Sequence, residues 1–118
     1  MSLARALAPD PSVVLMDEPF AALDSITRDL LQEELLRIWA VSRQTFVLIT
    51  HNIEEAVFLA DRVLVMSGRP GRIDSTVEVD LPRPRTNAIR VDPRFVSIKE
   101  AISARLRASV LAQHGGRH

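Results

Sequence analysis

A chain of 118 residues is long enough for one domain with a modest hydrophobic core. Its 47% hydrophobic and 25% charged residues are typical of a soluble globular protein and argue against a disordered or fibrous one. Fifteen acidic and fifteen basic residues balance, so net charge does not direct the chain to nucleic acid or anionic lipid. The absence of cysteine excludes disulfides and thiolate metal sites. No apolar run approaches the roughly 18 residues that cross a bilayer, and no secretory signal is expected.

The first half of the sequence predicts helices alternating with strands. Good helix formers at residues 2–8 stop at Pro9, which indicates the end of a helix. The continuous apolar run at residues 13–16 predicts a strand buried on both faces, as in parallel sheets. Apolar residues spaced by three and four at positions 26–41 predict an amphipathic helix, with Asp24 or Ser25 as its N-cap.

The alternation continues to about residue 66. Residues 45–49 predict a second buried strand, residues 54–59 a short helix and residues 62–66 a third strand. Strands and helices alternating with short links are typical of a right-handed parallel α/β unit.

The remainder of the chain predicts a turn, a strand, a connection and a helix. After a turn at 67–72, residues 76–81 alternate like a half-exposed strand, and residues 81–87 form a proline-rich connection. The arginines between residues 83 and 94 are interpreted as a solvated surface. Asp92 and Pro93 are expected to begin a last helix that runs to about Leu111. Its predicted apolar face consists of Phe95, Ile98, Ile102, Leu106 and Val110.

Candidate functional residues lie at the carboxyl ends of two predicted strands. Asp17 and Glu18 follow the first strand, and His51 follows the second. Ligands of open parallel sheets bind beyond these ends, and carboxylates there can hold Mg²⁺ or orient a water. Each residue also has a structural interpretation: the acids can simply close a strand in solvent, and His51 can be a capping or packing histidine. Asp24 can be an N-cap only.

These motifs together resemble those of the ATP-binding cassette (ABC) ATPases. The run VVLMDEPF at residues 13–20 is similar to the Walker B segment of this family, which places Asp17 at the Mg²⁺ position and Glu18 at that of the catalytic carboxylate. AALD at 21–24 looks like the D-loop, which includes Asp24. LITHNIEEAVFLADRVLVMS at 48–67 resembles the H-loop region, with His51 as the histidine that contacts the γ-phosphate. LARALAPDP at 3–11 looks like the helix that follows the signature motif.

The resemblance implies a fold class and a domain plan. The fold would be α/β: part of a P-loop NTPase, with parallel strands flanked by helices and without the N-terminal Walker A half. Residues 1–81 would be the C-terminal part of the ATPase domain, residues 82–112 a connection and helix, and residues 113–118 a disordered tail. GRPGRI at 68–73, DLPRPR at 80–85 and DPRF at 92–95 resemble the importer subgroup for nitrate, sulfonate and taurine.

The implied activity is hydrolysis of ATP coupled to import. Glu18 would polarise the attacking water, His51 would hold the γ-phosphate, and Mg²⁺ at Asp17 would offset phosphate charge. Asp24 and His51 would contribute to nucleotide binding. The implied partners are a second ATPase subunit, with two nucleotides held between the subunits, and a membrane permease. Nucleic acid is not expected as a partner, and the location would be the cytoplasmic face of the cell membrane.

The sequence departs from the family in what it lacks. A P-loop needs G-x-x-x-x-G-K followed by Ser or Thr, but the four glycines and the single lysine, Lys99, are not arranged in this way. The signature motif and the Q-loop are also missing from these 118 residues. We therefore expect the isolated chain to bind ATP weakly or not at all. Asn52 stands where the family commonly has aspartate.

Several explanations of this absence are considered. The missing part is another chain, the start lies inside a longer gene, or the gene has decayed; Met1, standing where the family helix continues, favours the last two. The alternative function is a non-enzymatic remnant or interaction module. A third hypothesis is a cassette-type ATPase of DNA repair or chromosome maintenance, but the long coiled-coil insertions and DNA-facing basic surfaces usual in those proteins are not evident in this sequence.

Overall fold

The computed structural model describes residues 13–67 and 71–115, with side chains to residue 112. These residues form two compact units, residues 13–52 with 84–87 and residues 53–83 with 88–115. The helix expected at residues 2–8 lies outside the described residues. No helix in the described part of the chain is long and apolar enough to cross a membrane.

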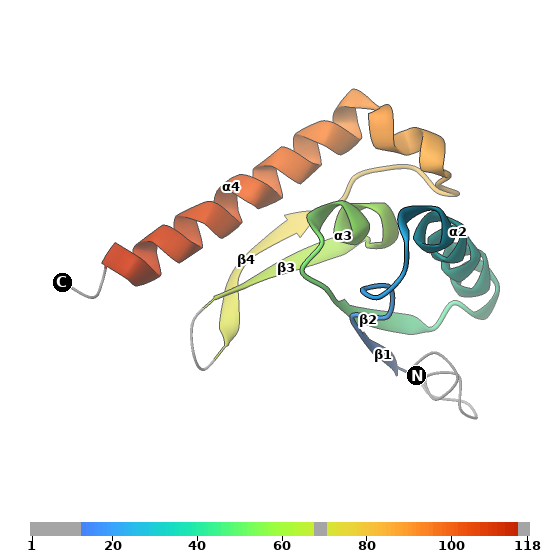
Figure 1. Ribbon diagram of the computed structural model, residues 1–118, viewed down its shortest axis with the longest axis horizontal. Helices are drawn as coiled ribbons and strands as arrows, with labels where there is room; N and C mark the ends of the chain where they lie inside the picture. The colour runs from blue at the N-terminus through green and yellow to red at the C-terminus, as the bar shows by residue number, and fades with distance from the viewer. Residues whose placement is uncertain (1–12, 68–70, 116–118) are drawn as a thin grey trace. The chain divides into compact units, whose positions relative to one another are not determined.

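The first unit is built on two parallel strands joined by a helix (Figure 1). Strand β1 (Val13–Asp17) pairs with β2 (Thr45–Ile49), and α2 (Ser25–Ser42) connects them. Val13 lies opposite Thr45 and Asp17 opposite Ile49, so both strands end at the same edge of the sheet. This parallel pair confirms the α/β arrangement predicted for residues 13–49.

The prediction that these strands are buried on both faces is wrong. Val14 and Met16 are buried, whereas Val13 and Leu15 are 54% and 59% exposed. The neighbouring Val47 is 44% exposed, so one face of this sheet presents apolar side chains to solvent. Within the described residues, no second layer covers that face. A continuous apolar run indicates what a strand can bury, but it does not supply the covering layer.

Helix α2 begins at its predicted cap and ends in a left-handed residue. The Asp24 carboxylate accepts the backbone N–H of Thr27 at 3.3 Å, which satisfies one donor that the first turn leaves unpaired. At the other end, Arg43 has φ 56° and donates its N–H to the carbonyl of Trp39 at 2.7 Å. Its guanidinium lies 4.7 Å from the centre of the Trp39 ring. The helix and its N-cap are therefore confirmed.

The apolar side of α2 is only partly buried. Among its residues, Leu35 and the polar Gln32 are buried. Four of the predicted apolar positions are exposed, namely Ile26, Leu30, Leu31 and Val41. Periodicity therefore identified which residues share a side of the helix, but not whether that side is covered.

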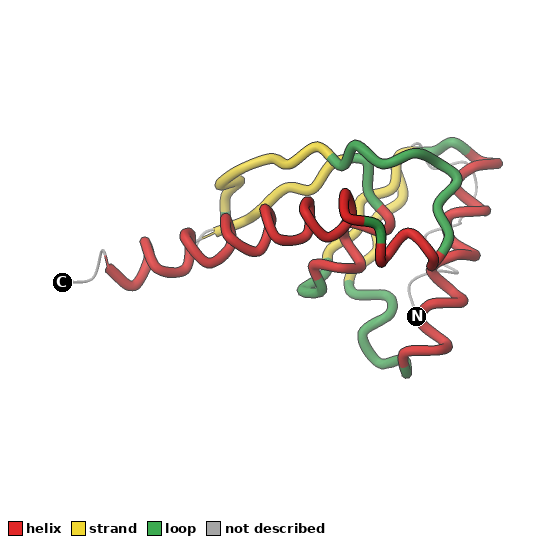
Figure 2. The backbone as a smooth tube through the Cα atoms, turned by 90° about the horizontal axis from the view of Figure 1, so that it is seen from above, coloured by secondary structure: helices red, strands yellow, loops and turns green. Residues whose placement is uncertain are grey.

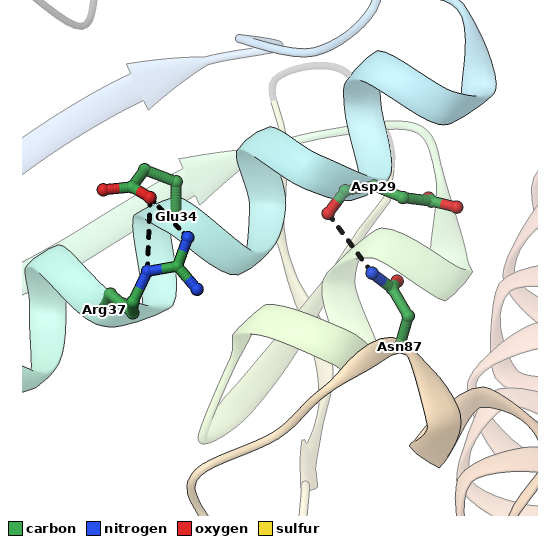
Figure 3. A network of polar contacts seen from close by, with 4 residues as sticks. All are labelled: Asp29, Glu34, Arg37 and Asn87. Atoms are coloured by element: carbon green, nitrogen blue, oxygen red, sulfur yellow. Dashed lines mark hydrogen bonds and ion pairs between the residues drawn. The ribbon is translucent and has the colours of Figure 1, made fainter.

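Residues 84–87 belong to the first unit and are held against the middle of α2 (Figure 3). The backbone N–H of Asn87 donates to Oε2 of Glu33 at 2.7 Å, and Nδ2 of Asn87 donates to the carbonyl of Asp29 at 3.4 Å. Glu34 and Arg37 form a neighbouring ion pair within the same helix. The end of the proline-rich connection is thus fixed by specific hydrogen bonds.

The second unit contains an antiparallel hairpin. Strand β3 (Arg62–Ser67) pairs with β4 (Arg72–Glu78), with a bulge between Val65 and Met66. The prediction that β3 continues the parallel sheet is wrong, because within the described residues β3 pairs with β4 alone. The short link between the two strands is compatible with antiparallel pairing, whereas a parallel pair needs a long crossover. The half-exposed strand expected at 76–81 begins and ends earlier, at 72–78.

Helix α4 (Pro93–Gly115) covers this hairpin and packs against α3 (Ile53–Leu59), as Figures 1 and 2 show from two sides. Phe95 and Ile102 are buried, but Leu106 and Val110 are 37% and 45% exposed. The predicted apolar face of α4 is therefore buried only in its first half. The helix extends beyond the expected end near Leu111, to Gly115, and residues 116–118 lie outside the described residues.

The interpretation of the arginines between residues 83 and 94 as a solvated surface holds for Arg94, whose side chain is 61% exposed, but is wrong for the other three, Arg83, Arg85 and Arg90. Nη2 of Arg83 donates to the carbonyl of Leu59 at 2.8 Å, and its Nε donates to Asp61 at 3.0 Å. In this way Arg83 satisfies a carbonyl at the C-terminal end of α3. Arg85 is buried, and the Arg90 guanidinium lies over the Phe58 ring. Long arginine side chains can bury their stems while their charged ends remain paired.

Candidate functional site

The candidate site lies where β1 and β2 end. Asp17 is the last residue of β1 and Glu18 follows it, while His51 comes two positions after Ile49, the last residue of β2. The N–H of Glu18 donates to the carbonyl of Ile49 at 2.7 Å, which extends the pairing by one residue. Because the strands are parallel, their carboxyl ends bring the acidic pair and the histidine to one edge of the sheet.

Glu18 and His51 are in direct contact. Nε2 of His51 lies 3.2 Å from Oε2 of Glu18. Imidazole Nε2 can donate a hydrogen bond to a carboxylate in its neutral Nε2–H form as well as in its protonated form. The His51 side chain is 88% exposed and the Glu18 side chain 37% exposed, so the pair is open to solvent and to an incoming ligand.

The backbone of Glu18 is in the left-handed conformation, with φ 47°. For a residue that is not glycine, this conformation costs roughly 1–2 kcal/mol. This conformation occurs where the chain leaves β1. There the carbonyl of Glu18 accepts the N–H of Ala21 at 3.3 Å, and Phe20, two residues further on, is buried. Non-glycine residues held in sparsely populated backbone conformations are often found at functional sites, which makes Glu18 a candidate position.

Asp24 has a different environment from Glu18. The hydrogen bond that the structure gives its side chain is to Thr27, on the helix that Asp24 caps. Hydrogen bonding from the side chain and then the backbone of Thr27 lowers the pKa of Asp24. The geometry therefore gives Asp24 the capping role that was one of its two interpretations.

Asp17 supplies a second exposed carboxylate at the same edge. Among the described residues, no group of three or more His, Cys, Asp or Glu side chains could hold a metal ion. Mg²⁺ is usually bound by one or two carboxylates together with substrate phosphates and water, and not by an all-protein cage. The adjacent acids Asp17 and Glu18 are of the donor type that such a Mg²⁺–nucleotide complex requires.

Sequence reasoning missed Thr50, which shapes the loop that carries His51. Its Oγ1 accepts the backbone N–H of Asn52 at 3.0 Å, closing a turn around His51. The available signal was a hydroxyl residue directly after a strand, since Ser and Thr often bond the backbone two residues further on.

Two parallel strands joined by a helix, with carboxylates and a histidine at their shared end, define a mixed α/β protein. Its similarity to known proteins is more specific. An ABC transporter ATP-binding protein of Methanocaldococcus jannaschii, named as uncharacterized, is 49% identical over 111 residues, which cover 94% of this chain and 40% of that protein. The taurine import ATP-binding protein of Pseudomonas entomophila is 45% identical over 111 residues, which cover 90% of this chain and 43% of that protein.

A Brucella abortus protein, provisionally named as an ATP-binding protein, is 52% identical over 101 residues, covering 86% of this chain and 39% of its own length. The chain is a homologue of ABC transporter ATP-binding proteins. It spans 39–43% of the length of these three relatives. No protein-family model matches the sequence.

Proposed function

We propose that this chain forms the hydrolytic edge of the ATP-binding subunit of an importer for sulfonate-type solutes. The observation that carries the proposal is the contact between His51 and Glu18 at the common end of β1 and β2. It is supported by homology to ABC transporter ATP-binding proteins, one of which is named for taurine import. Taurine is an aminosulfonate, in agreement with the subgroup that the GRPGRI and DLPRPR motifs resemble.

In this proposal the three residues have separate roles. The Glu18 carboxylate orients the attacking water and accepts its proton, which is general-base catalysis. The His51 imidazole donates to a γ-phosphate oxygen and keeps the phosphate in register with Glu18. Asp17 would hold Mg²⁺, which when bound would neutralise phosphate charge. The contact between His51 and Glu18 supports this division of roles, because it would keep the phosphate-binding and water-orienting groups within one hydrogen-bond length of each other.

The phosphate cradle has to come from outside these 118 residues. Their glycines and Lys99 do not form a P-loop, so no backbone amides are arranged around a triphosphate by this motif. We therefore expect isothermal titration calorimetry to detect weak or no ATP binding by the 118-residue chain. Micromolar affinity would contradict this expectation. A second ATPase subunit and a permease at the inner face of the membrane are the proposed partners.

A hybrid protein provides the direct test of hydrolysis. The N-terminal part of the taurine import protein that this chain does not match would be joined ahead of the chain, and ATPase activity measured. We expect Glu18→Gln to lower kcat by about 100-fold or more, because it removes the general base but preserves the shape of the side chain. Glu100→Gln on the exposed side of α4 is the matched control and should leave kcat unchanged.

The ATPase activity of the hybrid distinguishes an ATP-hydrolysing subunit from a non-enzymatic interaction module. A folded hybrid that hydrolyses ATP equally well with Gln at position 18 would contradict the catalytic role of Glu18. A folded hybrid without any ATPase activity, judged by circular dichroism and gel filtration, would instead favour the non-enzymatic interaction module.

A further inference from the structure

The His51 imidazole is not held in place by packing. Its side chain is 88% exposed, and the polar contact that the structure gives it is with Glu18. An exposed histidine on a loop would sample several rotamers, and ordering a side chain or backbone segment has an entropic cost. The loop backbone must therefore be fixed by other groups if the contact with Glu18 is to persist.

The hydroxyl of Thr50 provides such a group. Thr50 lies between the end of β2 and His51 and is half-buried. Its Oγ1 accepts the N–H of Asn52 at 3.0 Å, so the hydrogen bond spans His51 and restricts the peptide units on both sides of it. Directly after the neighbouring strand β1, Glu18 is held by the hydrogen bond that its N–H donates to the Ile49 carbonyl. Each member of the pair therefore has its own backbone restraint.

We propose that Thr50 is a positioning residue that aims His51 at Glu18. The proposal rests on the proposed function, since His51 is taken to act on the γ-phosphate. The positioning itself does not depend on ATP. Loss of the Oγ1 acceptor frees the peptide that follows His51, and the imidazole then leaves its 3.2 Å contact with Glu18. A displacement of about 1 Å in a reacting group can cost up to roughly 100-fold in rate.

Three variants of the 118-residue chain test the positioning. Thr50→Val keeps the size and branching of the side chain but removes the acceptor, whereas Thr50→Ser keeps the acceptor. Thr45→Val makes the same substitution at the opposite end of β2, where Thr45 is exposed. The measurement is the nuclear Overhauser effect between the His51 ring and the Glu18 side chain, together with the amide exchange rate of Asn52.

We expect Thr50→Val to lose the His51–Glu18 Overhauser effect and to accelerate Asn52 exchange at least tenfold, since about 1.4 kcal/mol corresponds to a factor of ten. Thr50→Ser and Thr45→Val should behave as the unchanged chain. An undiminished Overhauser effect in Thr50→Val, with dispersed spectra that show a folded chain, overturns the proposal.

The ATPase hybrid adds a separate readout. Thr50→Val should lower kcat about tenfold with KM little changed, and Thr50→Ser should restore kcat. An inactive hybrid would contradict the proposed function without affecting the nuclear magnetic resonance result. An active hybrid in which Thr50→Val has unchanged kcat would overturn the positioning role.

Discussion

The guanidinium of Arg90 lies over the ring of Phe58, 4.2 Å from its centre, and its Nη1 is 3.7 Å from Oε1 of Glu54. The Arg90 side chain is only 15% exposed, so this cation–π contact is largely shielded from water. We expect Arg90→Ala to lower the free energy of unfolding by about 2 kcal/mol. Urea denaturation followed by circular dichroism measures this change. Arg105→Ala, at an exposed position of α4, should change stability by less than about 0.5 kcal/mol; equal losses would contradict the prediction.

The two halves of α4 should respond differently to the same type of truncation. Ile102 is 3% exposed and Leu111 is 66% exposed, although both are aliphatic residues of one helix. Ile102→Ala leaves a cavity and should cost about 2–5 kcal/mol, enough to threaten a small domain. Leu111→Ala should be nearly neutral. If both variants unfold at the same urea concentration, the packing described for α4 is incorrect.

The left-handed backbone of Glu18 predicts an unusual order of stabilities. Glu18→Ala and Glu18→Gly both remove the carboxylate, but only glycine adopts φ 47° without a steric penalty. The glycine variant should therefore be more stable than the alanine variant by about 1 kcal/mol. Ala22→Gly, in the following turn, should instead lower the stability relative to the unchanged chain. Ala22 does not have positive φ, so glycine there only adds conformational freedom to the unfolded chain. Denaturation midpoints of the three variants give the comparison.

The N-cap of α2 should make stability depend on pH in the acid range. Hydrogen bonding from the Thr27 side chain and backbone lowers the pKa of Asp24 in the folded chain. A lowered folded pKa means that the stabilisation is complete above the unfolded pKa and is lost as the pH falls through the folded value.

Asp24→Asn is the informative variant for this dependence, because Asn also caps helices but does not titrate. The stability of the unchanged chain relative to that of Asp24→Asn should fall as the solution becomes strongly acidic. A difference in thermal stability that stays constant over that range would contradict the link to Asp24.

The site was more predictable than the burial around it. The acids after residue 16 and His51 after the second run could be placed together because parallel strands end at one edge, and this rule needs only strand direction. The contact between Glu18 and His51 follows from it. The positive φ of Glu18 and the turn closed by Thr50 depend on local backbone angles, which residue types other than glycine do not indicate.

The errors have a common physical origin. Apolar runs and helical spacing show which side chains share a face, but burial depends on whether another layer covers that face. Val13 and Leu15 are exposed for this reason, as is Leu30 on α2. The prediction for Arg83 was wrong in the opposite direction. Arg83 was expected to be a solvated charge, but it donates a hydrogen bond to the carbonyl of Leu59, which is distant in the sequence. Such long-range partners leave no local pattern in the sequence.

The position of Trp39, on which Arg43 stacks, has a practical consequence for observing the protein. Trp39 is the single tryptophan of a chain without tyrosine, and it belongs to the first of the two compact units. Its intrinsic fluorescence therefore reports on α2 and its surroundings, while the second unit contributes no comparable signal. If the fluorescence transition coincides with the loss of ellipticity, the two units unfold as one cooperative system. Separate transitions would show that each half melts independently.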